Sequence, residues 1–147
     1  MTRRLTLLTL LILILLPTVL SGCAGSSQSN ASMELKMAPL SEMPEEVRQS
    51  SVSVQDAYRF NVANPEIMKQ IPCYCGCGDM GHTSNYACYV KDDSNGQVTF
   101  DGHALGCSIC VDITLDTMRM LKEGKSVAEI KQAVDETYGK FGPSNIE

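Results

Sequence analysis

Six of the seven cysteines and both histidines of this chain fall between residues 73 and 110. The cysteines are Cys73, Cys75, Cys77, Cys88, Cys107 and Cys110, and the histidines are His82 and His103. Thiolate groups are the ligands that soft and borderline metal ions prefer, chiefly Cu(I) and Zn(II), and imidazole suits either ion. The clustering of all eight side chains in one segment therefore predicts a metal site.

The Cys-x-Cys-x-Cys run in residues 72–77 has the spacing for a shared metal centre. Two thiolates placed in this way can bind one ion or bridge two neighbouring ions. Gly76, Gly78 and Gly81 would let the backbone fold closely around them. Eight ligands could form two four-coordinate zinc sites of the Cys3His type, or a multinuclear Cu(I)-thiolate cluster.

A disulfide framework is an alternative, because six cysteines are an even set and disulfides persist in oxidising compartments. Neighbours in the Cys-x-Cys-x-Cys run would close very small rings with poor disulfide geometry. Each would therefore need a distant partner, and Cys88, Cys107 and Cys110 could supply three. A structural domain stapled by three disulfides thus stays open.

Thiol redox chemistry is a second alternative, with Cys107 and Cys110 as the catalytic pair. They form a Cys-x-x-Cys sequence ahead of a helix expected to begin near Val111. A helix N-terminus lowers the pKa of such a thiol. No βαβ pattern surrounds the pair, as a thioredoxin-like fold would require. With no hydrolase or kinase signature elsewhere, the sequence favours a binding protein over an enzyme.

The N-terminus has the order of a secretory signal: Arg3 and Arg4, an apolar stretch over residues 5–16, and small residues before Cys23. Leu-Ser-Gly-Cys at residues 20–23 resembles a lipobox, the sequence that bacterial lipoprotein signal peptidase recognises. This resemblance implies cleavage before Cys23 and lipidation of its thiol. An uncleaved anchoring helix is the alternative. Both place the rest of the chain outside the cytoplasm, and the lipid anchor places it on the outer face of the bacterial cell membrane.

Three parts of the chain are expected: the signal peptide at residues 1–22, a lipidated cysteine with a flexible spacer at 23–51, and a Cys/His-rich domain at 52–147. The net charge is −5, and both basic residues of the signal would be removed with it. An acidic chain of this kind does not suggest nucleic-acid binding. The expected partners are the membrane, through the lipid, and a metal donor or acceptor protein.

Helical spacing of apolar residues predicts the elements that position the cluster. One helix is expected over residues 54–63, and a second short turn begins after Asn64 with Pro65 at its first position. Residues 73–110 are dense in Gly, Asn and Asp and predict loop, with short strands at 86–90 or 98–100.

A helical hairpin is expected after Cys110. Its first helix ends at Gly124, and Ser126 with Glu129 forms a capping box for the second, which runs to Tyr138. The fold class is therefore mostly α, a small helical domain with a central Cys/Gly-rich loop region and a C-terminal hairpin. With no Trp and three Phe, its core is small enough to need metal or disulfide support.

The hexapeptide Pro-Cys-Tyr-Cys-Gly-Cys at residues 72–77, with the histidines and later cysteines, resembles the PCYCGC-motif family, lipoproteins of Bacillus-like bacteria. That family carries no established activity. The resemblance therefore implies lipidation, and the metal hypothesis rests on the chemistry of the cysteine and histidine side chains alone. Gly124-Lys125-Ser126 and Tyr138-Gly139 resemble, more weakly, the helical tail of thiol proteins of cytochrome c maturation, in which a Cys-x-x-Cys handles haem-attachment thiols. The pair lies closer to the Gly-Lys-Ser turn here, and no redox role is transferred.

These observations together predict a surface lipoprotein that binds a thiophilic metal for delivery or sequestration. Cu(I) is favoured over zinc, because surface-anchored exported proteins commonly handle copper.

Overall fold

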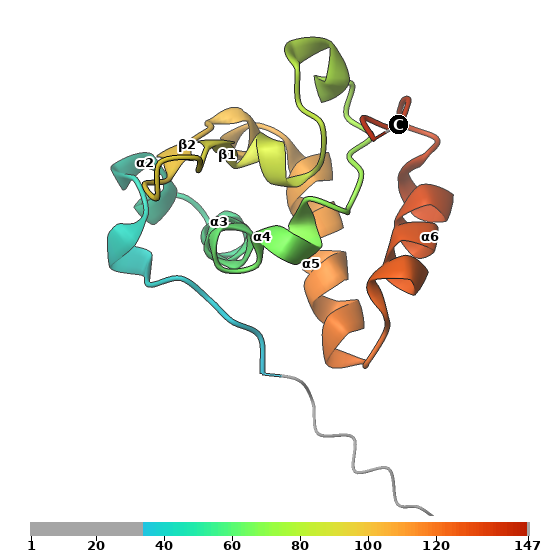
Figure 1. Cartoon of the computed structure of the whole chain (residues 1–147), viewed down its shortest axis with the longest axis horizontal. Coiled ribbons are helices and arrows are strands. Elements are labelled where there is room, and N and C mark those ends of the chain that lie inside the picture. Colours follow the sequence, from blue (N-terminus) through green and yellow to red (C-terminus); the bar gives the residue numbers. More distant parts are fainter. Residues whose placement is uncertain (1–33, 147) are drawn as a thin grey trace, which may run out of the picture.

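The computed structural model describes residues 34–146 and confirms the mostly α-helical class (Figure 1). The signal segment and Cys23 lie outside the described residues. The elements are η1 (Leu40–Glu42), α2 (Glu45–Arg48), α3 (Val52–Ala63), α4 (Pro65–Met68), η2 (Cys77–Met80), η3 (Tyr86–Cys88), β1 (Val90–Asp92), β2 (Thr99–Phe100), η4 (His103–Leu105), α5 (Ser108–Lys122) and α6 (Val127–Tyr138), where η denotes a 3₁₀-helix. No helix in this part of the chain combines the length and apolar character needed to cross a bilayer.

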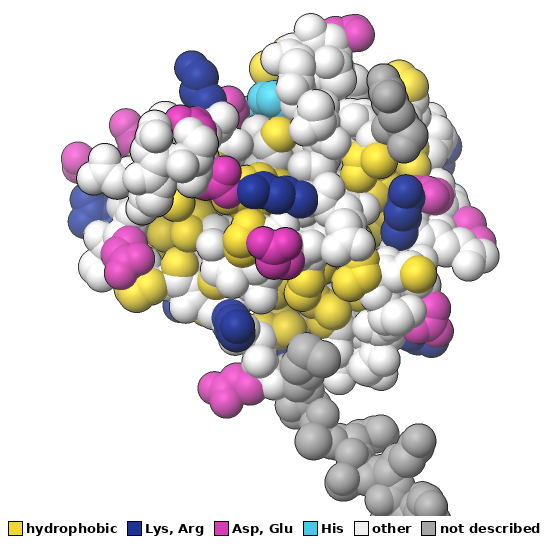
Figure 2. Space-filling model, viewed as in Figure 1, with side chains coloured by type: hydrophobic (Ala, Val, Ile, Leu, Met, Phe, Trp, Pro, Cys, Tyr) yellow, Lys and Arg dark blue, Asp and Glu magenta, His cyan; other side chains and the backbone are white. Residues whose placement is uncertain are grey.

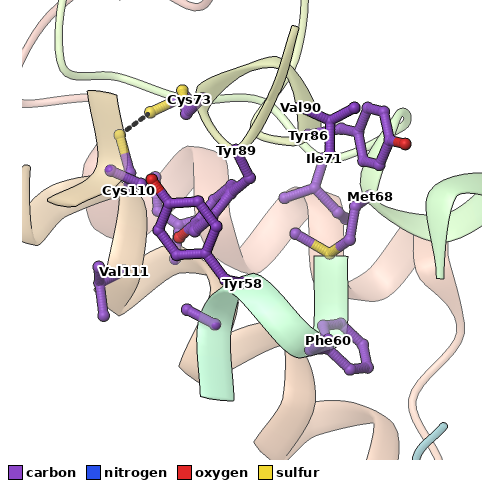
Figure 3. Packing of buried hydrophobic residues seen from close by; sticks show 14 of the residues in the cluster. Tyr58, Phe60, Met68, Ile71, Cys73, Tyr86, Tyr89, Val90, Cys110 and Val111 are labelled. Carbon is purple, nitrogen blue, oxygen red and sulfur yellow. Dashed lines mark hydrogen bonds between the residues drawn. The ribbon is translucent and has the colours of Figure 1, made fainter. Parts of the chain in front are cut away.

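The core lies where α3 packs against α5, with the loop region closing one end (Figures 1 and 3). Tyr58 and Phe60 of α3 and Ile113 of α5 are fully buried. The ring of Tyr89 stands edge-on to that of Tyr58, with centroids 4.8 Å apart. Aromatic rings of this kind bury a large apolar area, which compensates for the absence of Trp.

The C-terminal hairpin forms as the sequence predicts. Gly124 has φ of +80°, a conformation that glycine adopts without steric cost, and it turns the chain between α5 and α6. The Ser126 Oγ accepts the Glu129 N–H, and the Glu129 carboxylate accepts the Ser126 N–H, which completes the capping box. Ile130 and Val134 on the inner face of α6 are buried.

A two-stranded antiparallel sheet returns the chain from Cys88 towards His103. Val90 of β1 pairs with Phe100 of β2, and residues 93–98 join the strands, with an exposed turn at 94–96. The Asp101 N–H donates to the Tyr89 carbonyl at 2.8 Å and extends the pairing beyond β2. The sheet thus brings two distant cluster segments together. On the face in Figure 2, acidic and basic side chains are interspersed among apolar patches.

The segment before α3 packs onto the domain, although the sequence predicts a flexible spacer up to residue 51. Met43 and Val47 are 3% and 1% exposed, because η1 and α2 lay them on the core. The Ala38 N–H donates to the Arg59 carbonyl, and Arg59 Nε donates to the Ala38 carbonyl. The packed part of the chain therefore begins before the expected boundary at residue 52.

Alkaline pH should weaken the α5–α6 hairpin through Tyr138, whose Oη donates to Asp116 Oδ2 at 2.8 Å. Burial and then this hydrogen bond raise the pKa of Tyr138 above its ordinary value of 10.0. The unfolded chain ionises the phenol near that ordinary value, so the stabilisation by Tyr138 is complete below about pH 10 and is lost as pH rises through the folded-state pKa.

We therefore expect Tyr138→Phe to lose less unfolding free energy between neutral pH and about pH 11 than the unsubstituted chain. Urea unfolding followed by circular dichroism, with reductant present, measures both losses. Equal losses in the two proteins would contradict the assignment.

Candidate metal centre

The cluster forms where the Cys73–Cys77 loop meets the first turn of α5. Cys107 is the N-cap of α5 and Cys110 lies in its first turn. The helix therefore begins at Ser108, earlier than the expected start near Val111, because residues 108–110 already take helical geometry. Figure 3 shows the sulfur of Cys110 facing that of Cys73.

The thiol sulfurs lie close together without being bonded. Cys73 Sγ is 3.4 Å from Cys75 Sγ and 3.5 Å from Cys110 Sγ. Cys77 Sγ and Cys88 Sγ are 3.5 Å apart. A disulfide bond would bring the two sulfurs to about 2.05 Å, and all six cysteines of the described chain are free thiols. The structure therefore contains none of the three disulfides of the stapled-domain alternative.

All eight residues predicted from the sequence come together in three overlapping groups. In each group the ligand atoms lie within 4.8 Å of one another. The groups are Cys73, Cys75, Cys77 and Cys88; Cys75, His103, Cys107 and Cys110; and Cys77, His82, Cys88 and His103. Sulfurs bound about 2.3 Å from one tetrahedral ion lie about 3.8 Å apart. The observed spacings are a few tenths of an ångström shorter, so these groups could hold a metal ion.

The centre has an inner and an outer side. Cys73, Cys77, Cys88 and Cys110 are buried, and His82 is 9% exposed. By contrast, Cys75, His103 and Cys107 are only partly buried. The His103 Nε2 lies 3.4 Å from Cys75 Sγ, so this imidazole closes the outer side.

The pKa of the Cys73 thiol and the pKa values of its neighbours shift in opposite directions. Hydrogen bonds from Cys110, Cys77 and Cys88 lower the pKa of the Cys73 thiol far below its ordinary value. The hydrogen bond to Cys73 raises the pKa of Cys110, and burial raises that of Cys75. Hydrogen bonding raises the pKa of Cys77 and Cys88 as well. The shifts thus favour ionisation of the Cys73 thiol over ionisation of its neighbours. A thiophilic ion bound there would displace their protons.

Two glycines shape the loop that carries Cys73, Cys75 and Cys77. Gly76 and Gly81 have φ of +81° and +87° and flank η2, so the loop reverses on both sides of Cys77. The His82 N–H then donates to the Cys77 carbonyl at 3.3 Å. Of the three glycines noted in the sequence, Gly78 alone has no positive φ.

Asn145 contacts the cluster from the C-terminal tail, which the sequence did not predict. Its Oδ1 accepts the Cys73 N–H at 2.7 Å, and its Nδ2 donates to Cys77 Sγ at 3.5 Å. A Cβ on Gly142 would lie 2.9 Å from the Tyr74 carbonyl oxygen, so the tail approaches the loop more closely than a larger residue allows.

Asn85 links the backbone before the Cys73–Cys77 loop to the backbone at Cys110, and the sequence did not predict this contact. It is fully buried, its N–H donates to the Ile71 carbonyl at 2.8 Å, and its Nδ2 donates to the Cys110 carbonyl at 3.2 Å. Its Oδ1 accepts from Thr114 Oγ1 at 2.8 Å. An isolated Asn in a loop carries no sequence pattern that would predict this contact.

A family model described as "Protein of unknown function with PCYCGC motif" matches residues 12–144. The chain belongs to this family. The match covers the Cys73–Cys77 loop, both histidines and the helical hairpin. No curated protein and no solved structure matches the chain. The weaker resemblance to cytochrome c maturation proteins therefore gains no support.

Differences in burial predict the order in which the thiols react. In the reduced, metal-free protein, Cys75 and Cys107 should be alkylated first, because the other four thiols are buried. Brief iodoacetamide treatment followed by peptide mass spectrometry measures this order. Faster labelling of Cys88 or Cys110 than of Cys107 would contradict the described packing.

Loss of the Asn145 side chain should open the cluster. Asn145→Ala removes the contacts to the Cys73 N–H and to Cys77 Sγ, so we expect several-fold faster alkylation of Cys77. Lys140→Ala, an exposed substitution in the same tail, is the matched control and should leave the rate unchanged. An unchanged rate in Asn145→Ala would show that the tail does not shield the centre.

Proposed function

We propose that this protein is a surface-anchored lipoprotein that binds a thiophilic metal, Cu(I) ahead of zinc, for delivery or sequestration. The observation that carries the proposal is the overlap between the three ligand groups. Any two of them share at least one residue.

Shared ligands favour a multinuclear cluster over two separate zinc sites. Two independent four-coordinate sites would need two sets without a common member, and no two of the three groups meet that condition. Cys75 belongs to the first and second groups, and Cys77 and Cys88 both belong to the first and third groups. A thiolate sulfur can bridge two Cu(I) ions, so an overlapping, sulfur-rich set suits copper.

The donor chemistry also argues against hard cations. The three groups contain only cysteine and histidine. Ca²⁺ and Mg²⁺ are bound by oxygen ligands, whereas thiolate and imidazole select copper and zinc. The partial burial of the cluster would hold such an ion away from bulk water.

Anchoring and exchange complete the proposal. Lipid on Cys23 would hold the domain on the outer face of the bacterial cell membrane. The partly buried ligands Cys75, His103 and Cys107 would be the ones that a metal donor or acceptor protein reaches. Ligand exchange would begin on this outer side.

A thiol-disulfide oxidoreductase using Cys107 and Cys110 is the second candidate. The position of the pair at the N-terminus of α5 favours it, because reactive Cys-x-x-Cys pairs commonly stand at a helix N-terminus. Against it, Cys110 Sγ also lies 3.5 Å from Cys73 Sγ and 3.6 Å from Cys75 Sγ, so the pair is part of a larger cluster. An oxidoreductase would exchange disulfides with a reporter and lose that activity on Cys107→Ser.

Metal titration of the anaerobically purified, reduced chain tests the proposal. We expect more than one Cu(I) per chain and a copper–copper vector in X-ray absorption spectra. Cys77→Ser should lower the stoichiometry more than Cys107→Ser, because Cys77 belongs to two ligand groups and Cys107 to one. No metal uptake from copper or zinc, together with six unreactive thiols, would refute metal binding.

A further inference from the structure

The two ring nitrogens of His82 have different surroundings. Nε2 lies 3.6 Å from Oδ2 of Asp101. Nδ1 is buried and has no hydrogen-bond partner among the described residues. A buried polar nitrogen without a partner costs free energy, so such an atom in a folded protein requires an explanation.

The position of the ring suggests that explanation. A ring nitrogen of His82 lies within 4.8 Å of the sulfurs of Cys77 and Cys88 and of a ring nitrogen of His103. The two imidazoles stand edge to face, with centroids 5.1 Å apart. The unpartnered nitrogen therefore belongs to a ring already placed among sulfur and nitrogen donors.

Asp101 is held firmly at the end of β2. Its N–H donates to the Tyr89 carbonyl, and its carbonyl accepts from Tyr58 Oη at 2.7 Å. Its Oδ1 accepts the His103 N–H at 2.8 Å, and its Oδ2 is the oxygen near His82. One carboxylate thus accepts from the backbone of one histidine and lies beside the ring of the other.

We infer that Asp101 is a positioning residue for the metal centre, which holds Nε2 of His82 so that Nδ1 serves as the metal ligand. The inference rests on the proposed function. A histidine bound to a metal commonly donates its other ring N–H to a carboxylate, which sets the tautomer and orients the ring. The 3.6 Å separation is longer than a hydrogen bond, so the inference requires a small rotation of the His82 ring or of the carboxylate.

Asp101→Ser separates the two roles of the carboxylate. A serine hydroxyl can still accept the His103 N–H within the same turn, but it is too short to reach His82. Competition between the full, reduced chain and a chromophoric Cu(I) chelator measures affinity. We expect binding roughly 10–100-fold weaker than in the unsubstituted chain. Asp116→Ser, which alters a carboxylate bonded to Tyr138, is the control and should bind normally.

A double-mutant cycle tests whether Asp101 acts through His82. In a His82→Ala background, Asp101→Ser should cause little additional loss of affinity, because the ligand it orients is already absent. An equal loss in both backgrounds would show a merely structural role and would overturn the inference. Nitrogen-15 spectra of the metal-free chain should show Nε2-protonated His82, with the tautomer preference relaxed by Asp101→Ser. An unchanged preference would also overturn it.

The same measurements separate this inference from the proposed function. If the unsubstituted chain takes up no Cu(I), the proposed function fails, and the inference fails with it. If that chain binds Cu(I) and Asp101→Ser binds it equally well, the positioning role alone is refuted.

Discussion

The contact between the first turn of α5 and the Cys73–Cys77 loop joins the two halves of the cluster. Cys110 is placed by a helix that is buried against α3, whereas Cys73 lies in a loop with no regular structure. Their sulfurs are 3.5 Å apart only because the backbone on each side is fixed. Asn85 bonds to the helix carbonyl at Cys110, and Asn145 bonds to the main chain at Cys73. These two contacts hold the loop and the helix in fixed positions relative to each other.

Three of the five tyrosines, Tyr58, Tyr74 and Tyr89, connect the loop region to the helices. Each of the five places an apolar ring in or against the core and bonds through its hydroxyl to a residue elsewhere in the chain. The partners are the Asp101 carbonyl for Tyr58, Asp135 for Tyr74, Asp93 for Tyr86, Thr114 for Tyr89 and Asp116 for Tyr138. A small core can therefore hold a long loop region in one conformation, and this fixes the positions of the cysteine and histidine side chains that the loop region carries.

The overlap of the ligand groups follows from this compact arrangement. Six thiols and two imidazoles come from loop segments, three 3₁₀ turns and the start of one helix, and they converge on one small volume. Buried thiols surrounded by other thiols favour a cation that replaces their protons. The partly buried side, with Cys75, His103 and Cys107, would give such a cation a route in and out.

Local sequence rules determined much of this protein. Helical spacing, Pro65, Gly124 and the Ser126–Glu129 capping box predicted the helices, because caps and glycine turns depend on residues a few positions apart. Clustering of cysteine and histidine predicted the types of candidate ligand, because the chemistry of each side chain is a property of the residue itself. The tertiary structure alone decided that the ligand groups overlap and that all six thiols are free. It also decided the positions of Asp101 and Asn145, and it packed α2 on the core where low apolar periodicity had suggested a spacer. These features depend on contacts between residues distant in the chain, and no local pattern specifies such contacts.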